Sequence, residues 1–224
     1  MQIAIFADIH GNYEALETIL KDIENRKIDN IICLGDVIGR GFNSRECLET
    51  VLNNPKIEMC LGNHEVRCIN GEEYLPNEES EICDKKVMKK IITDDLIEKL
   101  KAKPLVINKK IGNNNIMFYH YPVKNNNFIP LQRYISEDAF NINNANITIF
   151  GHIHKHVEKK IGNNIYVALD TAGYRKDNLT NYMILDVNEY SYSMQNIELE
   201  YKNTTQDVYK NRKWGSKFAI KYRY

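Results

Sequence analysis

The sequence predicts an α/β fold in which a largely parallel sheet carries helices on its faces and a second sheet follows. Three observations predict it. Short apolar runs alternate with segments of helical spacing in the first part of the chain, and each run ends in a glycine or a polar residue. After Pro104, further short strand-like runs follow one another closely, which favours a second, mainly antiparallel sheet.

The first part of the chain contains three strands and two intervening helices. An apolar run over residues 2–7 predicts a strand, and a helix begins near Tyr13, where apolar side chains recur at three and four residues. A second strand covers residues 31–34 and leads through a glycine-rich turn to a helix over 44–52. A third strand covers residues 57–61. This alternation predicts parallel strands with helical crossovers.

The second part begins with a charged segment of helical character over residues 67–103, in which Thr93 marks a helix start and Pro104 ends the segment. Turn dipeptides such as Gly-Asn then separate short β-prone runs. The strands predicted from these runs cover residues 105–108, 116–120, 147–150, 165–169, 182–187 and 190–197.

Composition indicates one globular domain. The chain has 224 residues, is 43% hydrophobic, and carries 30 basic and 30 acidic side chains, which excludes disordered and collagen-like classes. Five cysteines without a CxxC pair indicate neither a disulfide scaffold nor a zinc ribbon. No apolar run is long enough for a signal-peptide core or a membrane span. We therefore expect a cytoplasmic protein that does not enter a membrane; its oligomeric state stays open.

The C-terminal segment differs in charge from the rest of the chain. Residues 201–224 contain seven basic side chains and one acid, so residues 1–200 carry a matching excess of acids. Six aromatic side chains are interleaved with these cations. We expect a catalytic domain over 1–200 and a basic aromatic tail over 201–224 that docks on the same domain. Binding of nucleic acid by the tail is the less favoured alternative, because the body is not basic.

Histidines gather where the predicted strands end, which is where ligand sites form in α/β folds. Five of the six histidines lie there, beside a Gly, Asp or Asn. Imidazole, carboxylate and amide ligands suit divalent Mn, Fe, Co, Ni or Zn better than Ca or Mg. The residues that could form such a site are Asp8, His10, Asp36, Asn63, His64, His120, His152 and His154.

The order of the motifs is more specific than any one of them. Asp8-Ile9-His10 is followed by Gly35-Asp36, then Gly62-Asn63-His64-Glu65, then His120, and finally Gly151-His152-Ile153-His154. This series resembles the calcineurin-like metallophosphoesterase superfamily. The resemblance covers residues 8–154 and implies a four-layer sandwich of two packed mixed β-sheets flanked by helices.

The resemblance also implies a site for two divalent metal ions. We expect manganese, with iron, zinc, nickel or cobalt as alternatives. By the family's pattern, Asp36 bridges the two ions. A turn after Phe150 must bring both His152 and His154 to the site. The implied ligands are Asp8, His10, Asp36 and His154 for one ion, and Asp36, Asn63, His120 and His152 for the other.

The implied activity is hydrolysis of a phosphate ester by in-line attack of a hydroxide that bridges the two metals. In the family, the histidine that matches His64 acts on the leaving group as a general acid or charge stabiliser. The substrate stays open between phosphomonoesters, including phosphoproteins, and phosphodiesters. The alternatives are a dinucleoside polyphosphate hydrolase, a nuclease, or a non-catalytic scaffold for protein interaction on the same fold.

Arg40 is the expected phosphate-binding side chain. The stretch 35–41 is similar to the G-D-x-x-D-R-G motif of protein serine/threonine phosphatases, in which the arginine binds phosphate. Gly39 stands where those enzymes have the aspartate that pairs with the catalytic histidine, so His64 lacks that partner or takes another. Tyr121 is expected to pack, with stacking on substrate as the alternative. The weaker candidates for the site are Asn12, Arg45, Arg67, Lys155 and His156.

Overall fold

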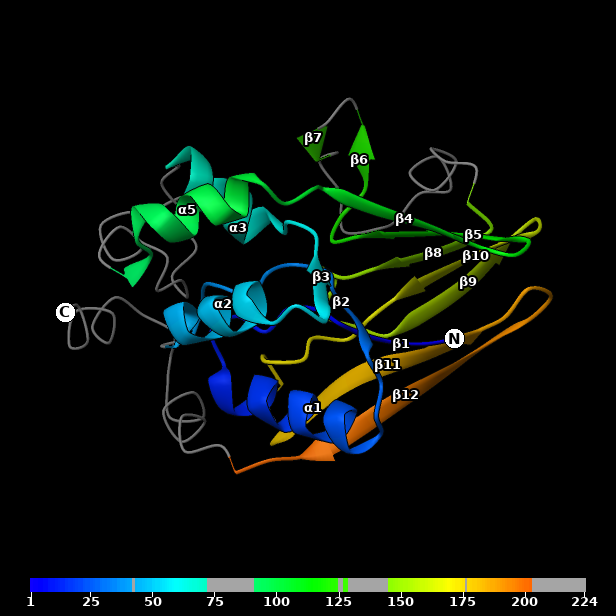
Figure 1. Ribbon diagram of the computed structural model, residues 1–224, viewed down its shortest axis with the longest axis horizontal. Coiled ribbons are helices and arrows are strands. Elements are labelled where there is room, and N and C mark those ends of the chain that lie inside the picture. Colours follow the sequence, from blue (N-terminus) through cyan, green and yellow to red (C-terminus); the bar gives the residue numbers. More distant parts are fainter. Residues whose placement is uncertain (42, 72–90, 125–126, 129–144, 176, 203–224) are drawn as a thin grey trace.

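The computed structural model describes residues 1–41, 43–71, 91–124, 127–128, 145–175 and 177–202. In these residues, two five-stranded sheets pack against each other, and helices lie along the outer side of the first sheet (Figure 1). The α/β fold with two packed mixed sheets is thereby confirmed. Beyond Lys202, the predicted tail lies outside the described residues. None of the described helices is long and apolar enough to cross a membrane.

The elements of the first half are β1 (Gln2–Phe6), α1 (Tyr13–Asn25), β2 (Asn30–Cys33), α2 (Ser44–Asn53), β3 (Ile57–Met59), α3 (Asn63–Asn70) and α5 (Asp94–Lys101). Those of the second half are β4 (Val106–Ile111), β5 (Asn114–Tyr119), β6 (Val123–Lys124), β7 (Asn127–Phe128), β8 (Ile147–Phe150), β9 (Val157–Ile161), β10 (Asn164–Ala168), β11 (Leu179–Val187) and β12 (Tyr192–Glu200).

The first sheet has the strand order β12-β11-β1-β2-β3. Its strands β1, β2 and β3 are parallel, as predicted, but β11 and β12 are antiparallel and make the sheet mixed. The prediction that these two strands belong to the second sheet is wrong. The physical reason lies in β11, which is buried on both faces: Tyr182 and Ile184 pack with the helices, whereas Met183 and Leu185 face the second sheet.

The second sheet has the order β4-β5-β8-β10-β9. Only the two edge hairpins are antiparallel, because β5, β8 and β10 run parallel to one another. The expectation of a mainly antiparallel sheet is therefore wrong: the long segments between these three strands are crossovers and not hairpins. Strand β9 was not predicted at all, because three of its five residues are charged and it lies at the edge of the sheet.

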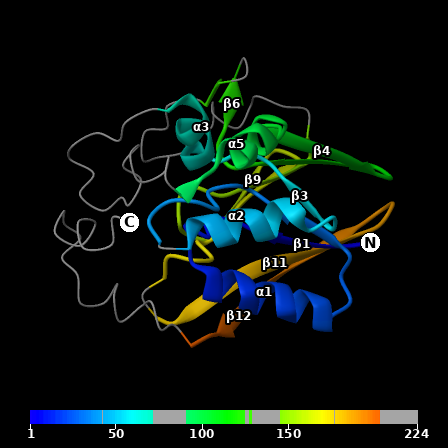
Figure 2. The same cartoon turned by 60° about the vertical axis from the view of Figure 1, so that its left-hand side comes forward.

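The core has two layers, one on each side of the first sheet. In β1, Ala4 and Phe6 face the apolar side of α1, while Ile3 and Ile5 pack into the cluster between the sheets. Because both faces of β1 are buried, its register is fixed, and so is the point at which its carboxyl end leaves the sheet. Figure 2 shows α1 and α2 side by side over this sheet.

Candidate metal centre

The carboxyl ends of strands from both sheets meet at one edge of the molecule. Asp8 follows β1, Asp36 follows β2, and Asn63 comes after β3 at the start of α3. His120 comes directly after β5, and His152 follows β8. The topology therefore brings together side chains that are far apart in the sequence, as the strand-end positions predict.

The backbone at this edge is strained. Asp8, His10, Asp36, His152 and His154 have left-handed φ values between 51° and 73°. For residues with a Cβ atom this conformation costs about 1 kcal/mol or more, and it persists where surrounding contacts impose it. At His152 and His154 it forms the turn after β8 that the sequence requires. These left-handed backbone turns direct the side chains of consecutive motifs toward the same place.

Asp8, His10 and His154 form the first cluster of ligand atoms. The Nε2 atoms of His10 and His154 are 2.9 Å apart, and His154 Nε2 lies 3.1 Å from Asp8 Oδ1. His10 Nε2 is 3.6 Å from the same carboxylate oxygen and 4.0 Å from Asp36 Oδ2. The two Nε2 atoms and Asp8 Oδ1 thus lie close enough together to share one metal ion.

Asp36, Asn63, His120 and His152 form the second cluster. His120 Nε2 lies 3.2 Å from Asp36 Oδ2, 3.1 Å from Asn63 Oδ1 and 3.2 Å from His152 Nδ1. His152 Nδ1 is 2.8 Å from Asn63 Oδ1. On its other side, His120 Nδ1 lies 3.0 Å from the carbonyl oxygen of Leu34. With Nδ1–H donating there, Nε2 is the nitrogen that can give up its proton and face the cluster as a ligand atom, which is the arrangement that metal-ligating histidines use.

The residues present fit two divalent cations. In each cluster, the Asp and His ligand atoms lie within 4.8 Å of one another. Ligands bound to one ion at ~2.0–2.2 Å stand about 3 Å apart, as several of these pairs do. Among the described residues, none supplies a hydrogen-bond partner for the buried His10 Nδ1. Asp36 lies between the clusters and offers its carboxylate to both.

His64 lies beside the clusters without belonging to either. Its side chain is buried, and its Nε2 is 3.7 Å from Asp36 Oδ2. Its backbone N–H donates to Asp36 Oδ1 over 2.9 Å. His10, Asp36 and His64 also meet the 4.8 Å criterion for ligand atoms. With Gly39 in place of an aspartate, Asp36 supplies a carboxylate close to His64.

The site favours an ionised carboxylate at Asp8, and burial favours neutral rings at His10, His64 and His152, whereas His120 differs from these three histidines. Burial opposes ionisation of Asp8, yet His154 and His120 keep the pKa of that carboxyl well below its ordinary value. Burial lowers the pKa of His10 and His64, and it lowers the pKa of His152 to about 4. For His120, burial is outweighed by Asp36 and Asp8, which raise its pKa to about 9.

Glu65 is a buried residue of the site for which the sequence predicted no role. Its carboxylate accepts hydrogen bonds from the backbone N–H groups of Asp36, Val37, Ile38 and Gly62 at 2.8–3.2 Å. Burial raises its pKa to about 7. The signal was present in the sequence, because Glu65 directly follows His64 in its motif. Glu65 ties the Asp36 turn to the first turn of α3.

The loop 170–174 is a second part of the site that sequence reasoning missed. The hydroxyl of Thr171 and the N–H of Gly173 both donate to the carbonyl oxygen of Asp8, at 2.8 and 3.0 Å. A Cβ atom at Gly173 would lie 1.8 Å from the carbonyl oxygen of Ile9, so only glycine fits. The ring of Tyr174 stands 5.8 Å from the ring of His154. No local pattern marks this loop.

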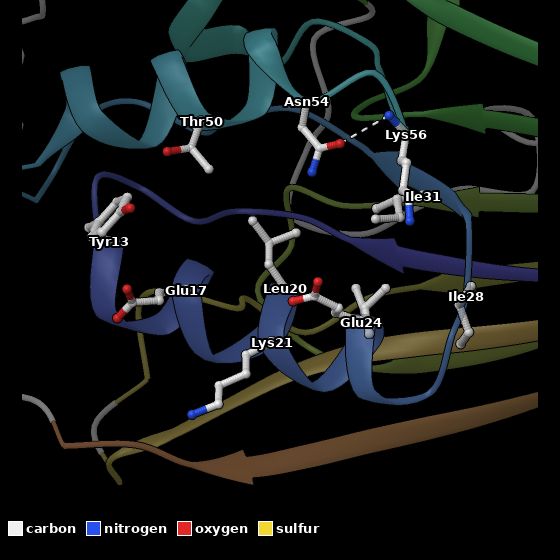
Figure 3. A pocket seen from close by; sticks show the side chains of 11 residues that line it. Tyr13, Glu17, Leu20, Lys21, Glu24, Ile28, Ile31, Thr50, Asn54 and Lys56 are labelled. Atoms are coloured by element: carbon white, nitrogen blue, oxygen red, sulfur yellow. Dashed lines mark hydrogen bonds between the residues drawn. The ribbon is translucent and has the colours of Figure 1, made fainter.

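A cavity of about 370 Å³ opens over the clusters. Arg40 lines it, and so does Arg67, one helical turn after His64. A larger hollow of about 510 Å³ lies between α1 and α2, where Leu20 points between the helices with Glu17 and Glu24 on α1 (Figure 3). None of the ligand clusters found among the described residues lies in that hollow.

The remaining candidates are placed as follows. Asn12 caps α1 by accepting from the N–H of Ala15, and Arg45 pairs with Glu49 on the exposed side of α2. His156 lies 3.2 Å from Glu158, outside both clusters, and Lys155 is exposed. Tyr121 is buried with its ring 4.2 Å from that of His152, which agrees with a packing role.

Comparisons with known proteins identify the family and the fold of the chain. A family model described as calcineurin-like phosphoesterase superfamily domain matches residues 1–190. An uncharacterized protein of Methanocaldococcus jannaschii is 29% identical, over 94% of this chain and 93% of the relative. Serine/threonine-protein phosphatase 2 of Escherichia coli is 27% identical, over 81% of this chain and 92% of the relative. The crystal structure of a metallophosphoesterase from Sphaerobacter thermophilus matches with a TM-score of 0.70 at 19% identity and covers 100% of this chain and 98% of that one, which shows a shared fold.

Proposed function

Because the chain belongs to the calcineurin-like phosphoesterase superfamily, we propose that it is an enzyme that uses two divalent metal ions to hydrolyse a phosphate ester. The observation that carries the proposal is the pair of ligand clusters that share Asp36. A non-catalytic scaffold on the same fold would have no need of such clusters, whereas here every expected ligand position holds a competent side chain.

Asp8, His10, Asp36 and His154 would hold one ion, and Asp36, Asn63, His120 and His152 the other. We expect manganese, because nitrogen and oxygen ligands without thiolate accept it, although iron, zinc, nickel and cobalt fit the same set. Two such ions supply an activated water and neutralise charge on the phosphoryl oxygens. The strained turns and Glu65 hold the ligands in place before any substrate binds.

Two further side chains act on the substrate. His64, whose imidazole faces the cavity beside Asp36, donates an N–H to the leaving oxygen and stabilises the charge that develops there. Arg40 lines the same cavity and binds phosphoryl oxygens through its planar guanidinium. Its backbone φ of 55° places it among the strained residues of the site, which supports a functional role.

The proposal is tested by hydrolysis of p-nitrophenyl phosphate and bis-p-nitrophenyl phosphate with manganese supplied. We expect wild-type protein to cleave at least one ester and Asp36→Asn to lose roughly 10³-fold in kcat, because the shared ligand of both ions is weakened. Asp95→Asn is the matched control: Asp95 is exposed and pairs with Lys99 on α5, so the same substitution there leaves hydrolysis unchanged.

His64→Gln separates the leaving-group role from metal binding. We expect it to keep manganese binding and to lose more activity with phenyl phosphate than with p-nitrophenyl phosphate, because the poorer leaving group needs more help from a proton donor. An equal loss with both esters contradicts that role. If wild-type protein cleaves neither p-nitrophenyl ester with Mn, Fe, Co, Ni or Zn supplied, the enzyme proposal fails and a scaffold function is favoured.

A further inference from the structure

Tyr174 lies between the first ligand cluster and Arg40. Its ring centroid is 5.8 Å from the ring of His154 and 6.1 Å from the ring of His10. On the same ring, the guanidinium carbon of Arg40 sits 4.8 Å from the centroid. This is within the ~6 Å at which a cation is attracted to an aromatic face. Tyr174 therefore lies beside two histidines of the first cluster and beside the cation expected to bind phosphate.

The backbone alone does not fix where the Arg40 side chain lies. Arg40 stands between Gly39 and Gly41, with a left-handed φ of 55° after the φ of 93° at Gly39. Its long side chain has many rotamers, and ordering it costs conformational entropy. A guanidinium held over an aromatic face by a cation–π contact loses part of that freedom before substrate arrives. The contact with Tyr174 thus favours one direction of the Arg40 side chain.

Tyr174 is itself tied to the metal ligands. Its backbone N–H donates to the hydroxyl of Thr171 over 3.1 Å, and that hydroxyl donates to the carbonyl oxygen of Asp8 over 2.8 Å. The carbonyl oxygen of Gly173, the residue before it, accepts from the buried side chain of Asn12 at 2.8 Å. These bonds hold Tyr174 in a defined position relative to Asp8, and the contact with Tyr174 extends this to the Arg40 guanidinium.

A fixed guanidinium in this place discriminates between classes of phosphate ester. A monoester is a dianion at neutral pH and presents three non-bridging oxygens, whereas a diester is a monoanion with two and brings a second organic group. A guanidinium binds a monoester more strongly, because it can interact with the third charged oxygen. It also occupies space that the second organic group of a diester would need. Arg67 lines the same cavity and adds a second positive charge.

We propose that Tyr174 and Arg40 form an anion subsite that makes the cavity select phosphomonoesters over phosphodiesters, with Tyr174 as the residue that positions Arg40. This rests on the proposed function, which leaves the class of ester open. Tyr174 touches Arg40 and two metal ligands and is needed for its ring, not for its hydroxyl.

The test compares kcat and KM for p-nitrophenyl phosphate and bis-p-nitrophenyl phosphate with manganese. Tyr174→Leu is expected to raise KM for the monoester about tenfold and leave the diester nearly unchanged, so the monoester preference falls about tenfold. Tyr174→Phe keeps the ring and the preference. Tyr190→Leu is the matched control, because Tyr190 is 80% exposed in the turn between β11 and β12.

A double-mutant cycle tests whether Tyr174 acts through Arg40. In an Arg40→Ala background, Tyr174→Leu should cost nothing further, because the cation it positions is gone. The proposal would be overturned if the losses in kcat/KM for the monoester were additive, or if Tyr174→Leu lost equally with both esters. It would also be overturned if Tyr174→Phe lost as much monoester preference as Tyr174→Leu, or if Tyr174→Leu bound manganese more weakly than wild type.

A readout without turnover keeps this inference distinguishable from the proposed function. In the metal-free protein, the side-chain resonances of Arg40 should show a ring-current shift in wild type and Tyr174→Phe that is lost in Tyr174→Leu. Inorganic phosphate should bind the manganese-loaded protein about tenfold more weakly in Tyr174→Leu, measured by calorimetry. If the esters are not cleaved but these differences hold, the subsite stands and the proposed function fails; if hydrolysis is present and these differences are absent, the subsite is wrong.

Discussion

The pKa of His120 is shifted in the opposite direction to the pKa of His10, His64 and His152. Burial would lower its pKa, but Asp36 and Asp8 raise it to about 9, whereas the pKa of His152 lies at about 4. His120 is a proposed metal ligand, and a ligand must give up its proton, so loading the proposed site at pH 7 would displace one proton from His120. In the metal-free protein, the same raised pKa adds stability that is complete below about pH 6.5 and is lost as the pH rises through 9.

We therefore expect manganese affinity to rise about tenfold per pH unit between pH 7 and 8.5 and to level off above pH 9. Calorimetric titration in buffers of different ionisation enthalpy measures both the affinity and the proton released. A release close to one proton at pH 7 is the expected value. An affinity independent of pH over this range would show that His120 is already neutral before metal binds.

At the scale of single residues, the sequence located ligand-type side chains better than it located their supports. Asp8, His64 and the other candidates could be predicted because each stands beside a turn residue at a strand end. Tyr174 has no such signal, since a tyrosine in a loop is common and its contact with Arg40 joins distant parts of the chain. Contacts of this kind depend on topology, which composition and spacing do not encode.

At the scale of elements, Glu65 joins α3 to the turn after β2. Its carboxylate receives four backbone N–H donors from both segments. In Glu65→Gln, an amide group that donates hydrogen bonds must face some of these donors. We expect a loss of about 2–3 kcal/mol in the free energy of unfolding. Urea unfolding of the metal-free protein measures it.

Glu46→Gln is the matched control, since Glu46 is also an acid in the first turn of a helix but is exposed on α2. It should change the free energy of unfolding by no more than about 0.5 kcal/mol. We also expect Glu65→Gln to bind manganese more weakly, because the turn that carries Asp36 is no longer held. A variant as stable as wild type would mean that these four donors find other partners.

The strands show why element types were easier to predict than sheet membership. Strands β1, β2, β3 and β8 lie close to their predicted ranges, because buried apolar runs between turn residues are local signals. Strand β9 was missed, although the six residues Lys-Lys-Ile-Gly-Asn-Asn at 109–114 recur at 159–164. Both copies form an edge hairpin with a left-handed glycine, Gly112 or Gly162. The repeat was the signal that could have identified β9.

At the scale of the whole molecule, charge is distributed between the body and its last segment. The described chain ends at Lys202, and the hydroxyl of Tyr201 accepts a hydrogen bond of 2.7 Å from Asn12 at the start of α1. Residues 203–224 add six basic side chains and one acid to a body that has an excess of acids. Docking of this segment on the body is still a prediction from composition, with nucleic-acid binding as its alternative.

Truncation after Lys202 tests that prediction. If the segment docks, the shorter chain should have a lower Tm, and 0.5 M salt should narrow the difference because it screens ionic attraction. Hydrolysis of p-nitrophenyl phosphate should persist, since every proposed ligand precedes the cut. Trp214 is the single tryptophan of the chain and lies in this segment, so its emission should shift to longer wavelength when salt releases it.

The two readings of the segment make opposite predictions for the same pair of proteins. Docking predicts a Tm difference and no binding of a single-stranded oligonucleotide by either chain. Binding of nucleic acid predicts equal Tm values, solvent-exposed Trp214 emission, and an affinity for the oligonucleotide that falls with salt and is lost on truncation. The second pattern would show that docking is wrong. It would also favour phosphodiester substrates, which contradicts the monoester selection inferred from Tyr174 and Arg40.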